Sequence, residues 1–187
     1  MKKIALVIAV LCLVFGLMGC KSDKPATAAQ GGVPTWVQEA RKDAPEDVIV
    51  GIGTAKLATM NQSMTTSETR ARGQVVRAMN SMVRSMVEDY TASSEVEPSA
   101  AVAFQQQIET SLAKAQLSGA RIVRQDFDQS GQCWTVVYFN KSNTRSEISQ
   151  AQAAAKLAVP AMLAFNAEAR MDEQFQKAAE EEWFGDY

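Results

Sequence analysis

The 187-residue chain has no histidine and only three cysteines, and these shortages exclude several kinds of chemistry. Without an imidazole, no general base of the usual kind is present to activate a serine or cysteine nucleophile. A zinc or copper site would also lack its commonest ligand, and too few thiols remain to replace it. The sequence therefore predicts a protein that is not an enzyme and that needs no metal and no cofactor.

Disulfides and excess positive charge are missing as well. Cys133 is the only cysteine beyond residue 20, so a disulfide framework cannot hold the fold. The formal net charge of −2 argues against a nucleic-acid partner, because such binding relies on a basic surface. An apolar fraction of 47% is enough for a packed core. We therefore expect one globular domain that is stabilised by packing alone.

The N-terminus has the plan of a secretory signal. Lys2 and Lys3 precede the apolar run Ile4 to Met18, which is too short for a comfortable membrane span. An ordinary signal peptide ends in an Ala-x-Ala-like site, whereas here Gly19 is followed directly by Cys20. The stretch Leu17-Met18-Gly19-Cys20 resembles the lipobox of bacterial lipoproteins.

The lipobox resemblance implies that residues 1–19 are a lipoprotein signal peptide and that the Cys20 thiol is lipidated. Acyl chains contribute about 0.8 kcal/mol per buried methylene, so several of them give a permanent membrane anchor. Lys21 stands where an aspartate would favour retention at the inner membrane, and we therefore expect the outer membrane. The alternative interpretation is an uncleaved N-terminal anchor with an incidental cysteine.

The mature chain divides into three parts. Residues 20–34 contain the lipidated cysteine and a stretch rich in Ala, Gly, Ser, Thr and Pro, which predicts a flexible tether. Residues 35–141 mix strand and helix patterns, and Trp36 is expected to cover part of the core. Residues 142–187 form a predicted helical segment in which Thr144 and Glu147 are a capping box and Pro160 divides the helix.

Within residues 35–141 the pattern is strand, long helix, second helix and hairpin. The β-branched stretch Asp47 to Ala55 predicts the strand, and the apolar spacing from Met64 to Tyr90 predicts the long helix. Pro98 suits the first turn of the second helix. A polar connection containing Gly131 joins two further strands, 120–127 and 132–140. The second of these is apolar on both faces and is therefore expected at the centre of a sheet.

Two capping boxes compete for the start of the long helix, Thr59 with Gln62 and Thr65 with Glu68. Along this helix Met79, Met82 and Met86 lie in one apolar arc. The arc predicts that they fill the core, with an adaptable partner-binding groove as the less common use.

This order of elements, with Pro34-Thr35-Trp36-Val37, the strand Val48 to Ala55, Ala71-Arg72 and the strand around Trp134, resembles the LPP20 family of bacterial lipoproteins. The resemblance implies an α+β fold, in which a small three-stranded antiparallel sheet packs on a long helix in a dodecin-like arrangement. It also implies an outer-membrane or surface lipoprotein without catalytic activity, whose flagellum-associated relatives assemble into envelope structures. The C-terminal helical extension departs from the family pattern.

Three further features are candidate sites. Gly51-x-Gly53 is spaced like the start of a dinucleotide-binding turn, but Lys56 stands where the third glycine belongs, which favours close packing instead. Arg72 lies inside the apolar arc. It either extends its charged end into water or pairs with a carboxylate or carbonyls that pin the sheet to the helix. Asp126 and Asp128 lack the loop of a dedicated calcium site, and we expect them to keep a turn soluble.

The aromatic tail is expected either to fold back on the domain or to dock on a neighbour. Its members are Trp183, Phe184 and Tyr187. Together these features predict a lipid-anchored envelope protein of the outer membrane, with a structural role in self-association or in binding an envelope partner. The alternative is a carrier that holds a small apolar ligand between sheet and helix.

Overall fold

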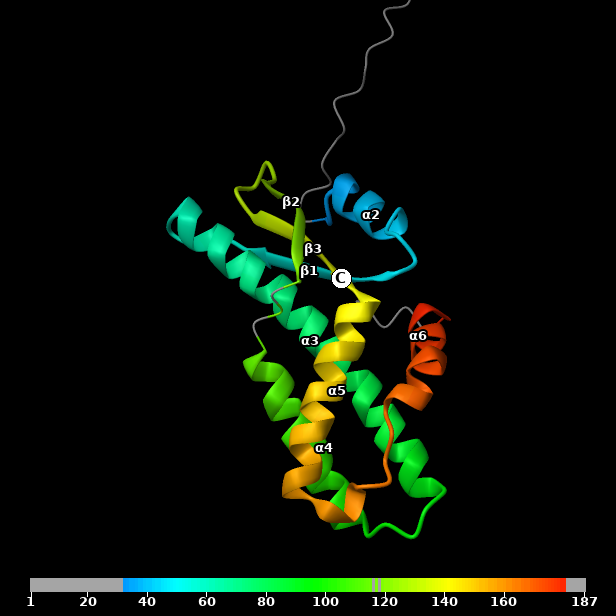
Figure 1. Ribbon diagram of the computed structural model, residues 1–187. Helices are drawn as coiled ribbons and strands as arrows, with labels where there is room; N and C mark the ends of the chain where they lie inside the picture. The colour runs from blue at the N-terminus through cyan, green and yellow to red at the C-terminus, as the bar shows by residue number, and fades with distance from the viewer. Residues whose placement is uncertain (1–31, 116, 118, 181–187) are drawn as a thin grey trace, which may run out of the picture.

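The computed structural model describes residues 32–115, 117 and 119–180 (Figure 1). Cys20 and its leader, and the aromatic tail of Trp183, Phe184 and Tyr187, lie outside the described residues. The elements in chain order are α2 (Thr35–Lys42), β1 (Val48–Ala55), α3 (Met60–Ala92), α4 (Pro98–Lys114), β2 (Arg121–Phe127), β3 (Cys133–Asn140), α5 (Lys141–Ala158), the 3-10 turns η1 (Pro160–Met162) and η2 (Glu168–Arg170), and α6 (Met171–Glu180).

The three strands form one antiparallel sheet in the order β1-β3-β2. Ala55 of β1 and Phe127 of β2 both lie opposite Cys133 of β3. Every residue of β3 before Asn140 is buried, which confirms the prediction that the second hairpin strand is central and covered on both faces. The pairing of β2 is interrupted between Ile122 and Arg124, where the register shifts.

The short helix α2 covers one face of the sheet (Figure 1). Val37 is fully buried there, and the hydroxyl of Tyr138 donates a hydrogen bond to the carbonyl oxygen of Ala40. Trp36 is partly buried, as expected, and the Arg124 guanidinium lies 4.5 Å from the centre of its ring. This helix was not predicted, because an eight-residue helix forms through its contact with the sheet rather than through its own propensity.

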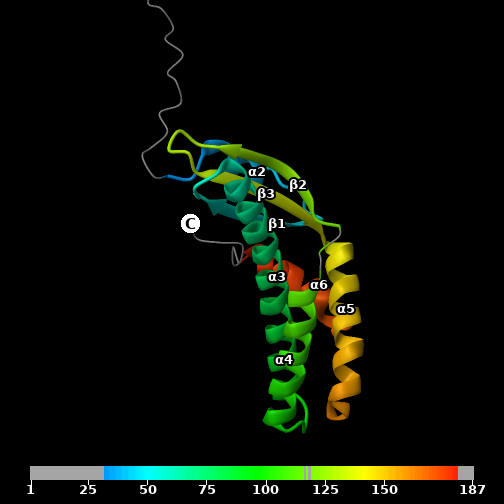
Figure 2. The ribbon, with the colours of Figure 1, turned by 90° about the vertical axis from the view of Figure 1, so that its left-hand side faces the viewer.

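The long helix α3 crosses the other face of the sheet and continues beyond it (Figure 2). Its cap is Thr59, whose hydroxyl accepts a hydrogen bond from the Gln62 amide at 3.2 Å. The first of the two predicted capping boxes therefore marks the helix start. Beyond the sheet, α3 packs with α4, α5 and α6 around a shared core. None of the helices in residues 32–115, 117 and 119–180 is both long and apolar enough to cross a membrane.

The C-terminal helical segment differs from the prediction at its start. The prediction that Thr144 and Glu147 form a capping box is wrong. Strand β3 runs directly into α5 at Lys141, so Thr144 is already inside the helix. The Thr144 hydroxyl is buried and donates to the carbonyl oxygen of Asn140. No side chain caps this helix at Asn140, and the Lys141 amide donates instead to the Asp47 carbonyl oxygen at 2.8 Å. Pro160 does divide the segment, as predicted.

The segment from residue 142 onward packs into the same core as α3 and α4. Phe165, between η1 and η2, is fully buried and makes edge-to-face contacts with Tyr90 and Phe104 at centroid distances of 5.4 and 5.3 Å. The other buried apolar residues of this segment are Ile148, Ala151, Ala155, Met162, Ala167, Met171 and Phe175. The fold is thus α+β, with a three-stranded antiparallel sheet on a long helix and a C-terminal helical portion, which confirms the predicted fold class.

Candidate functional site

The crossing of β1 over α3 brings two backbones into direct contact. A Cβ atom on Gly53 would lie 2.0 Å from the Ser67 carbonyl oxygen, and one on Gly51 would lie 2.3 Å from that of Ala71. No larger residue fits between these backbones. The structure therefore confirms that the glycine pair permits the close approach of strand and helix.

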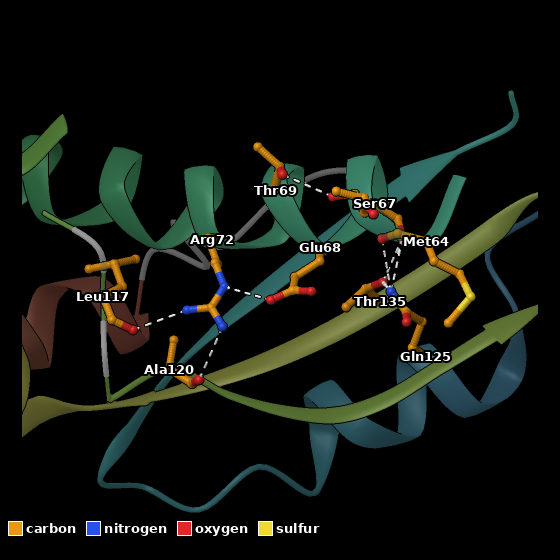
Figure 3. A network of polar contacts seen from close by, with 10 residues as sticks. Met64, Ser67, Glu68, Thr69, Arg72, Leu117, Ala120, Gln125 and Thr135 are labelled. Carbon is orange, nitrogen blue, oxygen red and sulfur yellow. Dashed lines mark hydrogen bonds and ion pairs between the residues drawn. The ribbon is translucent and has the colours of Figure 1, made fainter. Parts of the chain in front are cut away.

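A small polar network lies beside this crossing, between α3 and the central strand (Figure 3). The hydroxyls of Ser67 and Thr135 share a hydrogen bond of 2.7 Å, and Ser67 Oγ also donates to the Cys133 sulfur at 3.3 Å. Gln125 of β2 closes the network, with its amide nitrogen 2.8 Å from Thr135 Oγ1 and 2.9 Å from the Met64 carbonyl oxygen.

The chemistry of this network is structural. It contains two hydroxyls, one amide and a buried thiol, but no group that would remove a proton from any of them. Buried polar groups that satisfy one another fix the position of packed elements, here α3 on β3 and β2. Cys133 and Thr135 alternate along β3 and so share one face of the strand, but no local pattern indicates that Ser67 and Gln125 meet them.

Arg72 joins α3 to the connection between α4 and β2 (Figure 3). Its Nε lies 2.9 Å from Glu68 Oε1, its Nη1 donates to the Leu117 carbonyl oxygen at 3.0 Å, and its Nη2 reaches that of Ala120 at 3.5 Å. Leu117 is buried and has a φ of 42°, a left-handed conformation that a non-glycine residue seldom adopts. Arg72 thus contacts a carboxylate and carbonyls, and the segment it holds is the entry to β2.

Replacing Arg72 by leucine is expected to lower the free energy of unfolding by about 1–2 kcal/mol, because the Leu117 carbonyl loses a charged hydrogen-bond donor. The neighbouring Glu68→Gln change is expected to cost under about 0.5 kcal/mol, since the pair it weakens is partly exposed. Urea denaturation followed by circular dichroism measures both. Arg77→Leu, at an exposed position of the same helix, is the control. Unchanged stability in Arg72→Leu would remove its role as a pin.

The two aspartates of the hairpin are occupied by the hairpin itself. Burial raises the pKa of Asp128, but hydrogen bonds from Ser130, Trp134 and Gln132 outweigh it and leave that pKa below its usual value. The pKa of Asp126 is also lowered, chiefly by its hydrogen bond with Arg124. Both carboxylates therefore stabilise the turn. In the part of the chain that the structure describes, no group of three or more His, Cys, Asp and Glu is placed to hold a metal ion.

The remaining candidates are an open hollow and the methionines of α3. The hollow, of about 360 Å³, has mostly polar lining and no convergent set of reactive groups; it is bordered by Gly119, Phe139, Asn143, Ser146, Glu147 and Gln150. Met79, Met82 and Met86 are at most 1% exposed, which confirms that they fill the core.

Comparison with known proteins assigns neither a family nor a function to these residues. No family model matches the chain, and no curated protein matches it at a significant level. The resemblance to the LPP20 family therefore stays a prediction.

Proposed function

We propose that this protein is a non-catalytic lipoprotein of the bacterial envelope, anchored in the outer membrane through lipid on Cys20. The observation that carries the proposal is the stretch Leu17-Met18-Gly19-Cys20 at the end of a charged and then apolar leader. The folded domain begins soon after it, with α2 at Thr35. Such a chain holds a compact domain close to a membrane surface.

A structural or protein-interaction role is supported by the chemistry of the described residues. The polar groups between α3 and the sheet are paired with one another, and Arg72 and Asp128 are engaged in holding segments of the fold. Resemblance to the LPP20 family adds the expectation of an assembly at the outer membrane, including a flagellum-associated one. The partner is a second copy of this chain or another envelope protein.

The surface proposed for this partner is the end of the helices away from the sheet. Val102 near the start of α4, Leu157 near the end of α5 and Leu163 after η1 are 54%, 87% and 63% exposed. Large apolar side chains gathered at one exposed end are typical of a protein contact. The alternative of an apolar-ligand carrier is weaker, because the backbones of β1 and α3 touch at Gly51 and Gly53, where a ligand would need space.

Lipidation is tested by labelling cells that express the full chain with radioactive palmitate. Wild type is expected to carry the label and to begin at Cys20, whereas Cys20→Ser is expected to lose the label and the cleavage. Cys12→Ala is the matched control, because Cys12 lies in the leader and leaves with it. Label that persists in Cys20→Ser, or a mature wild-type protein that keeps residues 1–19, contradicts the proposal.

The assembly role is tested on the mature lipoprotein in detergent, by light scattering over a series of concentrations. A stable oligomer that is lost in Leu157→Gln supports self-association through the helical end. A monomer directs the search to another envelope protein, to be identified by cross-linking in intact envelopes.

A further inference from the structure

A second exposed apolar cluster lies at the opposite end of the molecule from the helical end. It consists of Leu57, just before α3, and Met60 and Met64 in its first turns, which are 47%, 67% and 36% exposed. Met60 and Met64 are four residues apart and so share one face of the helix. We call these three residues the sheet-end patch.

The sheet-end patch is held in place by hydrogen bonds. The Leu57 amide donates to Ser63 Oγ at 2.9 Å, which fixes Leu57 against the first turn of α3. Gln125 of β2 donates to the Met64 carbonyl oxygen at 2.9 Å, which ties the same turn to the sheet. The three apolar side chains are therefore presented by a rigid support, and their contact with a partner costs little ordering.

The sheet-end patch lies in a segment of the chain that has few charged side chains. Between Ala55 and Ser67 the only charged side chain is Lys56, which is exposed, and the other polar residues are Ser, Thr, Asn and Gln. By contrast, Glu95 and Glu97 are exposed just before α4 at the helical end. Glu68, one helical turn after Met64, is paired with Arg72 at 2.9 Å. Apolar side chains beside a lysine, next to a carboxylate that an arginine already neutralises, suit the headgroup region of a bilayer.

The position of the patch relative to the proposed lipid anchor also favours a bilayer as its partner. Both views place the start of α3 and the start of the described chain at the sheet end of the molecule (Figures 1 and 2). The chain from Cys20 to Gly32 spans at most about 40 Å when fully extended, and α3 alone extends about 50 Å towards the other end. A lipid on Cys20 thus brings the sheet end to the membrane more readily than the helical end.

We propose that the sheet-end patch of Leu57, Met60 and Met64 inserts shallowly into the outer membrane and orients the domain with its helical end pointing away. This inference rests on the proposed lipid anchor. Three half-exposed side chains bind a bilayer only weakly by themselves. Once the lipid is inserted, the patch meets the membrane at a high effective concentration, and a weak contact becomes persistent.

Oxidation of the methionines measures the contact between the patch and the membrane without an added label. Met60 and Met64 are exposed, whereas Met79, Met82, Met86, Met162 and Met171 are at most 1% exposed. A water-soluble oxidant therefore converts chiefly Met60 and Met64 to sulfoxides among the described residues. The mature lipoprotein, which begins at the lipidated Cys20, is reconstituted into vesicles of phosphatidylethanolamine and phosphatidylglycerol, floated on a density gradient and oxidised. Mass spectrometry then gives the rate at each methionine.

We expect oxidation of Met60 and Met64 to be about tenfold slower on the vesicles than in the chain from Lys21, which keeps every element of the fold but lacks the lipid. The matched control is Gln107→Met, which places an exposed methionine on α4, away from the sheet and outside the set of Val102, Leu157 and Leu163. Its Met-sulfoxide is expected to form at the same rate in both samples. Met60→Gln is expected to restore fast oxidation of Met64 on the vesicles, because it removes the most exposed member of the patch.

The outcomes separate this inference from the lipid anchor. Protein that floats but oxidises at Met60 and Met64 as fast as the lipid-free chain overturns the membrane contact and leaves the anchor intact. Protein that does not float overturns both. Protection that also appears in the lipid-free chain at raised concentration, without vesicles, makes this face a contact between copies and overturns the membrane assignment. Equal protection at residue 107 overturns the proposed orientation.

Discussion

Replacing Gly53 by alanine is expected to cost about 4 kcal/mol or more of unfolding free energy, which is enough to unfold a domain of ordinary stability. The added Cβ would lie 2.0 Å from the Ser67 carbonyl oxygen and 2.4 Å from the Ala71 nitrogen. Both are backbone atoms of α3, so no side-chain rotation relieves the overlap. The strand and helix must separate, which opens the core and breaks the hydrogen bond between Ser67 and Thr135.

A matched control for this change exists on the helix itself. Gly73 lies inside α3, and a Cβ there would meet only the end of the Arg77 side chain at 3.5 Å. Gly73→Ala is therefore expected to stabilise the protein by about 0.5–1 kcal/mol, since alanine is the better helix former. Urea denaturation followed by circular dichroism measures both variants. A Gly53→Ala protein as stable as wild type would show that β1 and α3 are not in backbone contact.

Replacing Phe165 by alanine is expected to lower the free energy of unfolding by about 3–5 kcal/mol. The ring is fully buried between Tyr90 of α3 and Phe104 of α4, and its loss leaves a cavity at the centre of the helical core. By the same reasoning, a chain that ends at residue 141 is expected not to fold. It would lack the fully buried Ile148, Met162 and Phe165 and would expose their partners to water.

Leu163 provides the comparison for Phe165. It lies two residues earlier in the same connection but is 63% exposed. Leu163→Ala is expected to change the free energy of unfolding by less than about 0.5 kcal/mol, because little of its surface is buried by folding. Thermal unfolding of both variants distinguishes a core position from a surface one. Equal and small effects would mean that the connection between α5 and α6 does not belong to the core.

The elements with strong local signals were predicted from the sequence. The strand at residues 48–55, the long helix, the hairpin and the division at Pro160 all follow from periodicity, turn residues and the geometry of proline. The central position of β3 was also predictable, because apolar side chains on both faces of a strand require cover on both sides. The proposed anchor at Cys20 likewise depends on a short linear motif and on nothing in the fold.

Features that depend on distant parts of the chain were not predictable in the same way. The eight-residue helix α2 forms against the sheet, and the capping signal at Thr144 is overridden by a strand that continues into a helix. The partners of Arg72, at Leu117 and Ala120, lie on a connection more than 40 residues away in sequence. Helical spacing showed only that this arginine faces the apolar side of α3.

The sequence by itself determined which side chains the protein lacks, the order of strands and helices, and the candidate lipidation site, because composition and local patterns carry that information. Only the tertiary structure decided which of these elements share a core and which apolar side chains stay exposed. Met64 and Met82 lie five turns apart on the same face of α3, yet one is 36% exposed and the other is buried. Burial is set by the packing of the other elements around a residue, which no local pattern records.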